Sequence, residues 1–239
     1  MGRGNQFRGT GGVFHVTHRC HNREFLLKFA RDRDTYRSIL RGQLRSSKVC
    51  LLDYCLTSNH VHLLLDAPER ENLSSLMQVV AGESARAYNR RKGRMNAFWG
   101  DNYHATAVEE GQYLWRCLVY IEMNMVRCAV VEHPRQWEWT GCREIMGERS
   151  RYRLLDLERL CWRLRTDDIH SLRRNLKSSL EERIASKQME REPSWTEGLA
   201  VGSRGFVEAM QPQIATRRQM GFLESATGWV LAEDSLPYT

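Results

Sequence analysis

Two apolar segments in the first third of the chain lie on either side of a short polar stretch. VCLLDYCL covers residues 49–56, HVHLLL covers residues 60–65, and Thr57-Ser58-Asn59 between them has the chemistry of a turn. The first segment is apolar at successive positions, which is typical of a strand that is covered on both faces of a sheet. The pair therefore predicts an antiparallel hairpin in the interior of a sheet.

The segments around this hairpin predict the rest of the sheet and its cover. VFHVTHR at residues 13–19 alternates as a strand, with Val13, His15, Thr17 and Arg19 on one face. A helix is expected near residues 32–44, and residues 72–89 follow a helical period closely. A strand at 105–109 and a helix at 110–126 complete the series. This order predicts an α+β fold, a ferredoxin-like antiparallel sheet covered by helices.

The pattern changes after about residue 146. Apolar residues at helical spacing predict two short amphipathic helices, at 154–164 and 169–184, the second with Asp167 or Asp168 as N-cap. We therefore predict one domain over residues 1–149 and a mostly helical C-terminal appendage, of unknown role, over residues 150–239.

The basic residues are dominated by arginine, which supplies 31 of the 36. Guanidinium groups bind phosphate in a bidentate manner, so this bias and the net charge of +7 fit a polyanionic partner. No apolar run approaches the roughly 20 residues of a membrane span, and the polar, Gly-rich start lacks the apolar core of a secretion signal. The seven cysteines contain no C-x-x-C pair. We therefore expect a cytoplasmic protein with reduced thiols and no membrane partner.

Two histidines in the second strand of the hairpin are candidate metal ligands. His60 and His62 are two residues apart, so both imidazoles project from the same strand face. Neutral imidazoles that converge in this way are natural ligands for a metal. The alternative is a pair of histidines satisfied by neighbouring groups. A zinc site that adds Cys50 and Cys55 is disfavoured, because simple alternation puts these two cysteines on opposite faces.

The helix expected at 110–126 carries two further candidates. The stripe expected to face the core consists of Leu114, Leu118, Ile121 and Met125. The neighbouring stripe consists of Tyr113, Cys117, Tyr120 and Asn124. Tyr120 and Asn124 are four residues apart, so a phenol and an amide face the same place at the edge of the sheet. This arrangement is either part of a site with the histidines or ordinary packing at the boundary of the core.

Taken together, three motifs resemble a known family. VFHVTHRCHNR, LTSNHVHLLL and YLWRCLVYIEMNMVRCAVV are similar to motifs of the single-tyrosine HUH transposases, and more narrowly of the REP-associated tyrosine transposase branch. HPRQWEWTGCREI resembles the segment that follows in that branch. The resemblance covers about residues 10–146, and residues 193–210 resemble a tail segment of some members.

The resemblance implies a specific activity. His60 and His62 would bind a divalent ion, Mg²⁺ or Mn²⁺, and Asn124 would complete the metal site. Tyr120 would be the nucleophile that cleaves single-stranded DNA, forming a 5′-phosphotyrosine link and a free 3′-OH that permits rejoining. The implied partner is single-stranded DNA with hairpins from palindromic repeats, on which the protein would act at the nucleoid. The protein would be a monomer or a homodimer, since relatives differ in oligomeric state.

Contacts to DNA are expected from basic and aromatic residues. The candidates are Arg19, Arg23, Arg86, Arg90, Arg91, Lys92, Arg94, Tyr103 and Arg127. The alternative for the cluster at 86–94 is a solvated helix end. The chain departs from the family pattern at Asn102, where an arginine is common, and at Met125, where a proline is common. These departures motivate a second hypothesis, a domesticated DNA-hairpin-binding protein without cleavage activity.

Overall fold

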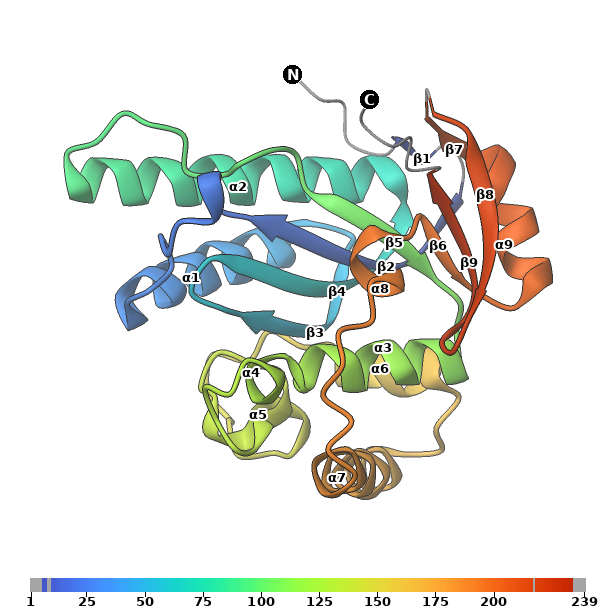
Figure 1. Ribbon diagram of the computed structural model, residues 1–239. Helices are drawn as coiled ribbons and strands as arrows, with labels where there is room; N and C mark the ends of the chain where they lie inside the picture. Colours follow the sequence, from blue (N-terminus) through green and yellow to red (C-terminus); the bar gives the residue numbers. More distant parts are fainter. Residues whose placement is uncertain (1–5, 8–9, 217, 234–239) are drawn as a thin grey trace.

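The centre of the protein is a seven-stranded sheet, drawn in Figure 1. The computed structural model describes residues 6–7, 10–216 and 218–233, so most of the polar N-terminal stretch examined for a secretion signal lies outside the described residues. The strands, in spatial order, are β3 (Cys50–Leu56), β4 (His60–Glu69), β2 (Thr10–Arg19), β5 (His104–Val108), β6 (Ala200–Gly202), β9 (Gly228–Glu233) and β8 (Met220–Ser225). β5 and β6 are parallel and the other neighbours are antiparallel. β1 (Gln6–Phe7) and β7 (Ile214–Ala215) form a separate pair.

The first half of the chain has the predicted ferredoxin-like topology. Its elements follow the order β2, α1 (Ala30–Ser46), β3, β4, α2 (Arg70–Lys92), β5. Its four strands lie in the order β3-β4-β2-β5, which is the strand order of a split βαβ pair. Both helices cover the same face of the sheet (Figure 1), where Leu40 and Val80 are fully buried against it. The α+β class expected from the order of the elements is confirmed.

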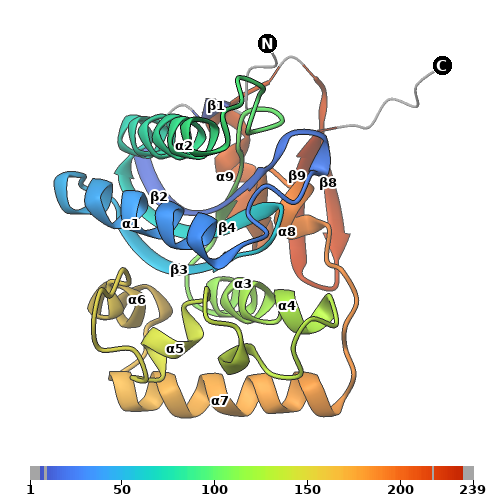
Figure 2. The ribbon, with the colours of Figure 1, turned by 90° about the vertical axis from the view of Figure 1, so that its left-hand side faces the viewer.

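The opposite face of the sheet is covered by α3 (Gln112–Glu122) and α6 (Leu157–Leu164). The predicted core stripe of α3 is buried, and Cys117, Tyr120 and Asn124 of the neighbouring stripe are buried as well. The helix expected over 110–126 is divided at Met123 into α3 and the single turn α4 (Asn124–Arg127). α7 (Ile169–Ala185) forms an outer layer beyond these helices, as Figure 2 shows. No helix in the described ranges is both long enough and apolar enough to cross a bilayer.

The region after residue 150 contains the predicted helices and, in addition, strands that the sequence pattern did not predict. Its helices include α6, α7, α8 (Ser194–Glu197) and α9 (Arg204–Met210). The unpredicted strands are β6, β8 and β9, so this region is less helical than expected. They continue the sheet of the first half through the pairing of Ala200 with Ala107. A three-residue strand such as β6 has too few residues to show a period, and its burial depends on a partner about 90 residues away. The boundary proposed after residue 149 stays a prediction, and the sheet runs across it.

Short helical turns complete the described chain. They are η1 (His21–Arg23), η2 (Pro134–Gln136), α5 (Cys142–Ile145) and η3 (Gln211–Gln213). Just before α5, Gly141 donates its N–H to the carbonyl of Tyr54 at 2.9 Å, which brings this loop onto β3. The buried Asp53 carboxyl occupies the space where a side chain at position 141 would start, since a Cβ there would lie 2.0 Å from its Oδ1.

Gly141→Ala is therefore expected to destabilise the protein, because the buried loop or Asp53 must shift to make room. Overpacking of this kind typically costs about 1–3 kcal/mol of unfolding free energy. The matched control is Gly42→Ala in α1, where a Cβ meets nothing within 4 Å and a helix-interior alanine should stabilise by about 0.5–1 kcal/mol. Urea unfolding of the two variants measures the difference, and equal midpoints would contradict the role given to Gly141.

Candidate active site

The hairpin positions the two histidines. In β4, His62 lies opposite Thr17 of β2 and His60 lies opposite Arg19, so both imidazoles project from the sheet face that α3 covers. The two ring centroids are 4.8 Å apart. Thr57 and Asn59 of the turn hold His60 through its Nδ1, at 3.0 Å from Thr57 Oγ1 and 2.7 Å from Asn59 Oδ1. The turn chemistry that predicted the hairpin therefore also orients one of the candidate ligands.

Asn124, the first residue of α4, lies against this pair. Its Nδ2 is 3.0 Å from His62 Nε2, and its side chain is 5% exposed. Among the described residues, no group bonds to its buried Oδ1. A buried amide oxygen without a partner is costly, and a cation held by this oxygen and the imidazoles would satisfy it, in place of the contact between Nδ2 and His62.

These three side chains fit a divalent cation. The described residues contain no cluster of three or more His, Cys, Asp or Glu that could hold a metal. A cation bound here would therefore need an amide ligand, and its protein ligands would be His60, His62 and the amide oxygen of Asn124. Such a set leaves coordination positions for oxygens of a substrate. Imidazole ligands suit Mn²⁺ better than Mg²⁺, which prefers oxygen donors.

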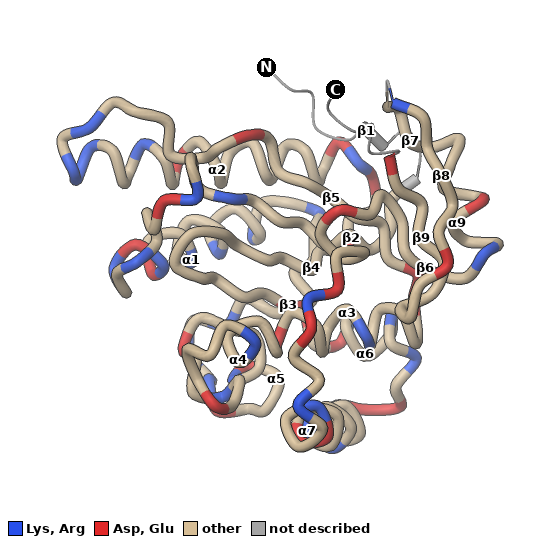
Figure 3. The backbone as a smooth tube through the Cα atoms, in the orientation of Figure 1, with Lys and Arg blue, Asp and Glu red and all other residues tan. Residues whose placement is uncertain are grey.

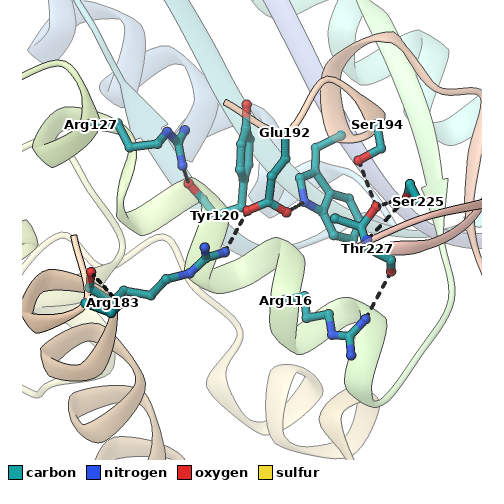
Figure 4. A network of polar contacts seen from close by, with 10 residues as sticks. Arg116, Tyr120, Arg127, Arg183, Glu192, Ser194, Ser225 and Thr227 are labelled. Atoms are coloured by element: carbon teal, nitrogen blue, oxygen red, sulfur yellow. Dashed lines mark hydrogen bonds and ion pairs between the residues drawn. The ribbon is translucent and has the colours of Figure 1, made fainter. Parts of the chain in front are cut away.

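Tyr120 lies beside the histidines. Its ring centroid is 6.2 Å from that of His62, and its side chain is 2% exposed. The guanidinium carbon of Arg127 is 4.0 Å from the centre of the Tyr120 ring, and Arg127 Nη1 donates to the Tyr120 carbonyl at 2.8 Å. Figure 4 shows Tyr120 between Arg127 and the segment that carries Glu192. The phenol, a fixed guanidinium and the imidazoles thus share one region.

Burial sets the protonation of these groups. It lowers the pKa of His60 to about 4, and it lowers the pKa of His62 well below its ordinary value. Both imidazoles are therefore neutral at pH 7 and offer a lone pair to a metal. Burial also raises the pKa of Tyr120, while the positive charges of Arg127 and Arg191 partly oppose this effect. The Tyr120 phenol is thus protonated at neutral pH.

Two groups in the site were not singled out from the sequence. His15 of β2 is fully buried, with its Nε2 2.9 Å from His62 Nδ1 and its Nδ1 2.8 Å from the carbonyl oxygen of Trp195. Strand alternation had placed His15 on one face with Thr17, and pairing of that strand with the hairpin would have pointed to the site. The position of Trp195, which comes from the C-terminal region, had no signal in the sequence.

A cavity of about 510 Å³ opens beside the histidine pair. Its lining includes Arg19, Arg23, His60, Asn102, Arg191 and Glu197. Volumes of this order are typical of ligand sites, and the arginines give the cavity a positive wall. The structure therefore brings two of the predicted DNA contacts, Arg19 and Arg23, to the same opening as the candidate metal ligands.

Comparison with known proteins identifies the family. Residues 10–124 match the family model for IS200-like transposases, a range that contains both histidines and Tyr120 and ends at Asn124. Residues 10–124 therefore belong to this family. No curated protein matches it.

Solved structures similar to this protein include two that match it over most of their own length. One is a REP-associated tyrosine transposase bound to a REP hairpin, at 16% identity and a TM-score of 0.53, with 62% of this chain and 86% of that chain covered. The other is a protein assigned as a transposase from Deinococcus radiodurans R1, at 21% identity and a TM-score of 0.36, covering 46% and 86%. The first likeness shows that the two proteins share a fold.

The other predicted DNA contacts lie elsewhere in the protein. Figure 3 shows basic residues gathered at the C-terminal end of α2 and the loop that follows it. They are Arg86, Arg90, Arg91, Lys92 and Arg94. Arg91 forms an ion pair with the buried Asp32, so it also serves the packing of α1 on α2. None of the five lines the cavity at the histidines. Tyr103 contacts α2 through its hydroxyl, 3.3 Å from Ser74 Oγ.

Cys50 and Cys55 lie on the same face of the sheet, contrary to the sequence prediction. Alternation placed Cys50 and Cys55 on opposite faces, but the register of β3 shifts between Leu51 and Asp53. Cys55 consequently pairs with His62 and Cys50 pairs with Asp66, on one face. The extra residue of a bulge inverts the alternation beyond it. Cys50 still lies four residues along β4 from His62, roughly 13 Å, which is too far for a common tetrahedral site.

Proposed function

We propose that this protein is a metal-dependent transposase that cleaves and rejoins single-stranded DNA at hairpin-forming repeats. In this proposal Tyr120 is the nucleophile, and His60, His62 and Asn124 hold the divalent cation. The observation that supports it best is the contact of Asn124 with His62, 3.0 Å between nitrogen atoms, beside a tyrosine ring 6.2 Å away. Two segments 62 residues apart, β4 and the consecutive helices α3 and α4, supply these groups, and residues 10–124 match a family of transposases.

The proposed reaction is a transfer of one phosphodiester. The Tyr120 phenol loses its proton, and its oxygen attacks the phosphorus. The bond from phosphorus to the 3′ oxygen breaks, and this oxygen takes up a proton in place of the one that the phenol released. The upstream strand therefore leaves with a 3′-OH, and the downstream strand stays linked through a 5′-phosphotyrosine. Attack of a 3′-OH on this link reverses the step and rejoins DNA. The energy of the phosphodiester is retained in the link, so no other co-reactant is needed.

The residues of the site have separate roles in this scheme. A bound divalent cation would neutralise charge on the phosphate oxygens. Arg127, fixed on the Tyr120 ring and carbonyl, stabilises the phenolate as it forms. Arg19 and Arg23 on the cavity wall bind and orient the DNA backbone on either side of the scissile phosphate. Since the phenol is buried and its pKa is raised, it is unreactive until a substrate and a cation are in place.

The proposed partner is single-stranded DNA that carries hairpins. The solved protein of similar fold is described as bound to a REP hairpin, and the basic end of α2 in this chain provides a second cationic surface away from the cavity. We propose that the flanking single strand enters the cavity while the hairpin contacts the α2 end. Arg86, Arg90, Lys92 and Arg94 would then bind backbone phosphates of the hairpin.

The test is formation of a covalent adduct with a labelled hairpin-flanked single strand in Mn²⁺, followed by denaturing gel electrophoresis. His62→Ala is expected to lower the rate of adduct formation by about a hundredfold or more, because it removes a ligand and leaves Asn124 without its contact. The control is His170→Ala, which changes an exposed histidine of α7 and should leave the rate unchanged. Chelation of the metal should have the same effect as His62→Ala.

A different set of results would contradict this function. Hairpin binding that depends on salt but is indifferent to metal and to His62→Ala, with no adduct from the unaltered protein, would favour the domesticated binding protein instead.

A further inference from the structure

A continuous row of hydrogen bonds runs from the C-terminal region to the candidate metal site. It begins at the main-chain carbonyl of Trp195, continues through both ring nitrogens of His15, and ends at His62 and Asn124. The successive distances are 2.8, 2.9 and 3.0 Å. The His15 and His62 rings are nearly parallel, with an interplanar angle of 13°. His15 is fully buried, and His62 is 2% exposed.

The carbonyl at one end of this row fixes the direction of every proton in it. A carbonyl oxygen only accepts, so Nδ1 of His15 carries a proton and donates to Trp195. A neutral His15 then has a bare Nε2, which accepts from Nδ1–H of His62. His62 is left with a bare Nε2, which accepts from Nδ2–H of Asn124 and would bind the candidate cation in place of that contact.

The opposite arrangement would need a buried charge. If His62 carried its proton on Nε2, its Nδ1 would have to accept from Nε2–H of His15, which would then carry two protons. A fully buried imidazolium is expensive unless a carboxylate compensates it, and neither described hydrogen bond of its ring goes to a carboxylate. The burial of His15 therefore selects the first arrangement.

We propose that His15 is a positioning residue that holds His62 in the tautomer able to bind metal through Nε2, and that the Trp195 carbonyl sets the tautomer of His15. The role deepens the proposed function and rests on its assignment of His62 as a ligand. A hydrogen-bonded partner behind a metal-bound histidine fixes both the orientation and the basicity of the ring.

The carbonyl that starts the row is itself held firmly. The Trp195 side chain is fully buried, and its Nε1 donates to Glu192 Oε2 at 2.9 Å. Thr106 Oγ1 of β5 lies 3.2 Å from the same carbonyl oxygen. Residues 192–195 of the C-terminal region thus have a structural role, because they complete the support of His62, a proposed metal ligand in the N-terminal half.

The direct test is ¹⁵N NMR of the full chain without metal, with labelled histidine. We expect Nδ1 protonated and Nε2 bare on both His15 and His62. In His15→Phe, which keeps a ring of similar size but has no acceptor, His62 should lose its fixed tautomer. His15→Gln places an amide oxygen close to the position of Nε2 and should restore it. A protonated Nε2 on His62 in the unaltered protein would overturn the proposal.

Metal affinity provides a second readout that does not depend on activity. Titration with Mn²⁺, followed by the loss of the free-ion EPR signal, should show binding weakened by about 10–100-fold in His15→Phe and largely recovered in His15→Gln. The control is His18→Phe, which alters a buried histidine on the other face of the same strand, stacked on Trp99. It should leave Mn²⁺ affinity and the His62 tautomer unchanged. Circular dichroism of each variant monitors folding.

The outcomes separate the two proposals. If the unaltered protein has the expected tautomers but binds no Mn²⁺, the assignment of the metal site is wrong while the row of hydrogen bonds stands. If Mn²⁺ binds equally well to the unaltered protein and to a folded His15→Phe variant, the positioning role is wrong and the proposed function is untouched. Weaker binding in His15→Phe that His15→Gln does not recover would also contradict the role, because packing alone would then explain the loss.

Discussion

Tyr120→Phe is expected to abolish the covalent protein–DNA adduct and to reduce strand cleavage at least about a thousandfold, as the loss of a catalytic nucleophile does in other enzymes. The variant removes one oxygen and keeps the ring, so the contacts of the ring with Arg127 and with the Trp195 ring remain possible. Binding of the hairpin should persist, because no proposed DNA contact is removed. Denaturing gels measure the adduct, and a gel-shift titration measures binding.

Tyr113→Phe is the matched control, since Tyr113 occupies the same helix two turns before Tyr120. This variant should form the adduct at the normal rate. An adduct that survives Tyr120→Phe would show that another residue is the nucleophile. Loss of the adduct in both variants, with normal thermal unfolding, would show that the assay reports the packing of α3 and would leave no support for Tyr120.

Glu122 of α3 and Asp53 of β3 are expected to contribute stability that is lost as the pH rises from about 4.5 to about 7, while the buried histidines, whose pKa values are lowered, contribute in the opposite direction. Glu122, two residues after Tyr120, is 1% exposed and accepts from Thr140 Oγ1 at 2.6 Å. Burial raises its pKa to about 7, and burial together with Glu122 raises the pKa of the fully buried Asp53. We expect the two carboxyl groups to share one proton, because both are buried and lie close to each other and to Glu144, and the pKa of each is raised.

The sign follows from which state holds the protons. A carboxyl whose folded pKa lies above its unfolded pKa binds its proton more tightly in the folded state, so its contribution is full below about pH 4.5 and is lost as the pH rises through the folded pKa. The slope is at most about 1.4 kcal/mol per pH unit for each proton released on unfolding. Glu144, which lies nearby, also raises both pKa values, and this effect acts in the same direction.

Glu122→Gln should remove the loss that comes from the carboxyl pair, so the unfolding free energy of the variant should rise relative to that of the unaltered chain between pH 4.5 and 7 and exceed it at pH 8. Its amide can donate to an ionised Asp53, so no shared proton is required. The control is Glu181→Gln, an exposed residue of α7, which should change the unfolding free energy by less than about 0.5 kcal/mol at any pH. Urea unfolding between pH 5 and 8 measures both variants. Equal slopes for Glu122→Gln and the unaltered chain over this range would contradict the shared proton.

The sequence was most informative where its signals were local. Apolar runs around a turn gave the hairpin, helical periods gave α1, α2 and the core stripe of α3, and alternation put His60 and His62 on one face. It was wrong for Cys50 and Cys55, because a bulge that adds one residue has no signature in a strand that is apolar on both faces. The stripe of Tyr120 and Asn124 was expected at the edge of the core, and it is buried instead. α7 and residues 192–195 cover that side of the protein, and local periodicity carries no information about where they pack.

What the sequence determined by itself is the set of elements and the residues that each one presents, because backbone geometry repeats every two or 3.6 residues whatever the surroundings. Tertiary structure alone decided which of those residues meet. The pairing of β2 with β4 put His15 behind His62, and the pairing of β5 with β6 carried Trp195 to the same place. These contacts join residues 47 and 180 positions apart. Their formation depends on the free energy of burying the whole sheet, and no short stretch of sequence encodes that.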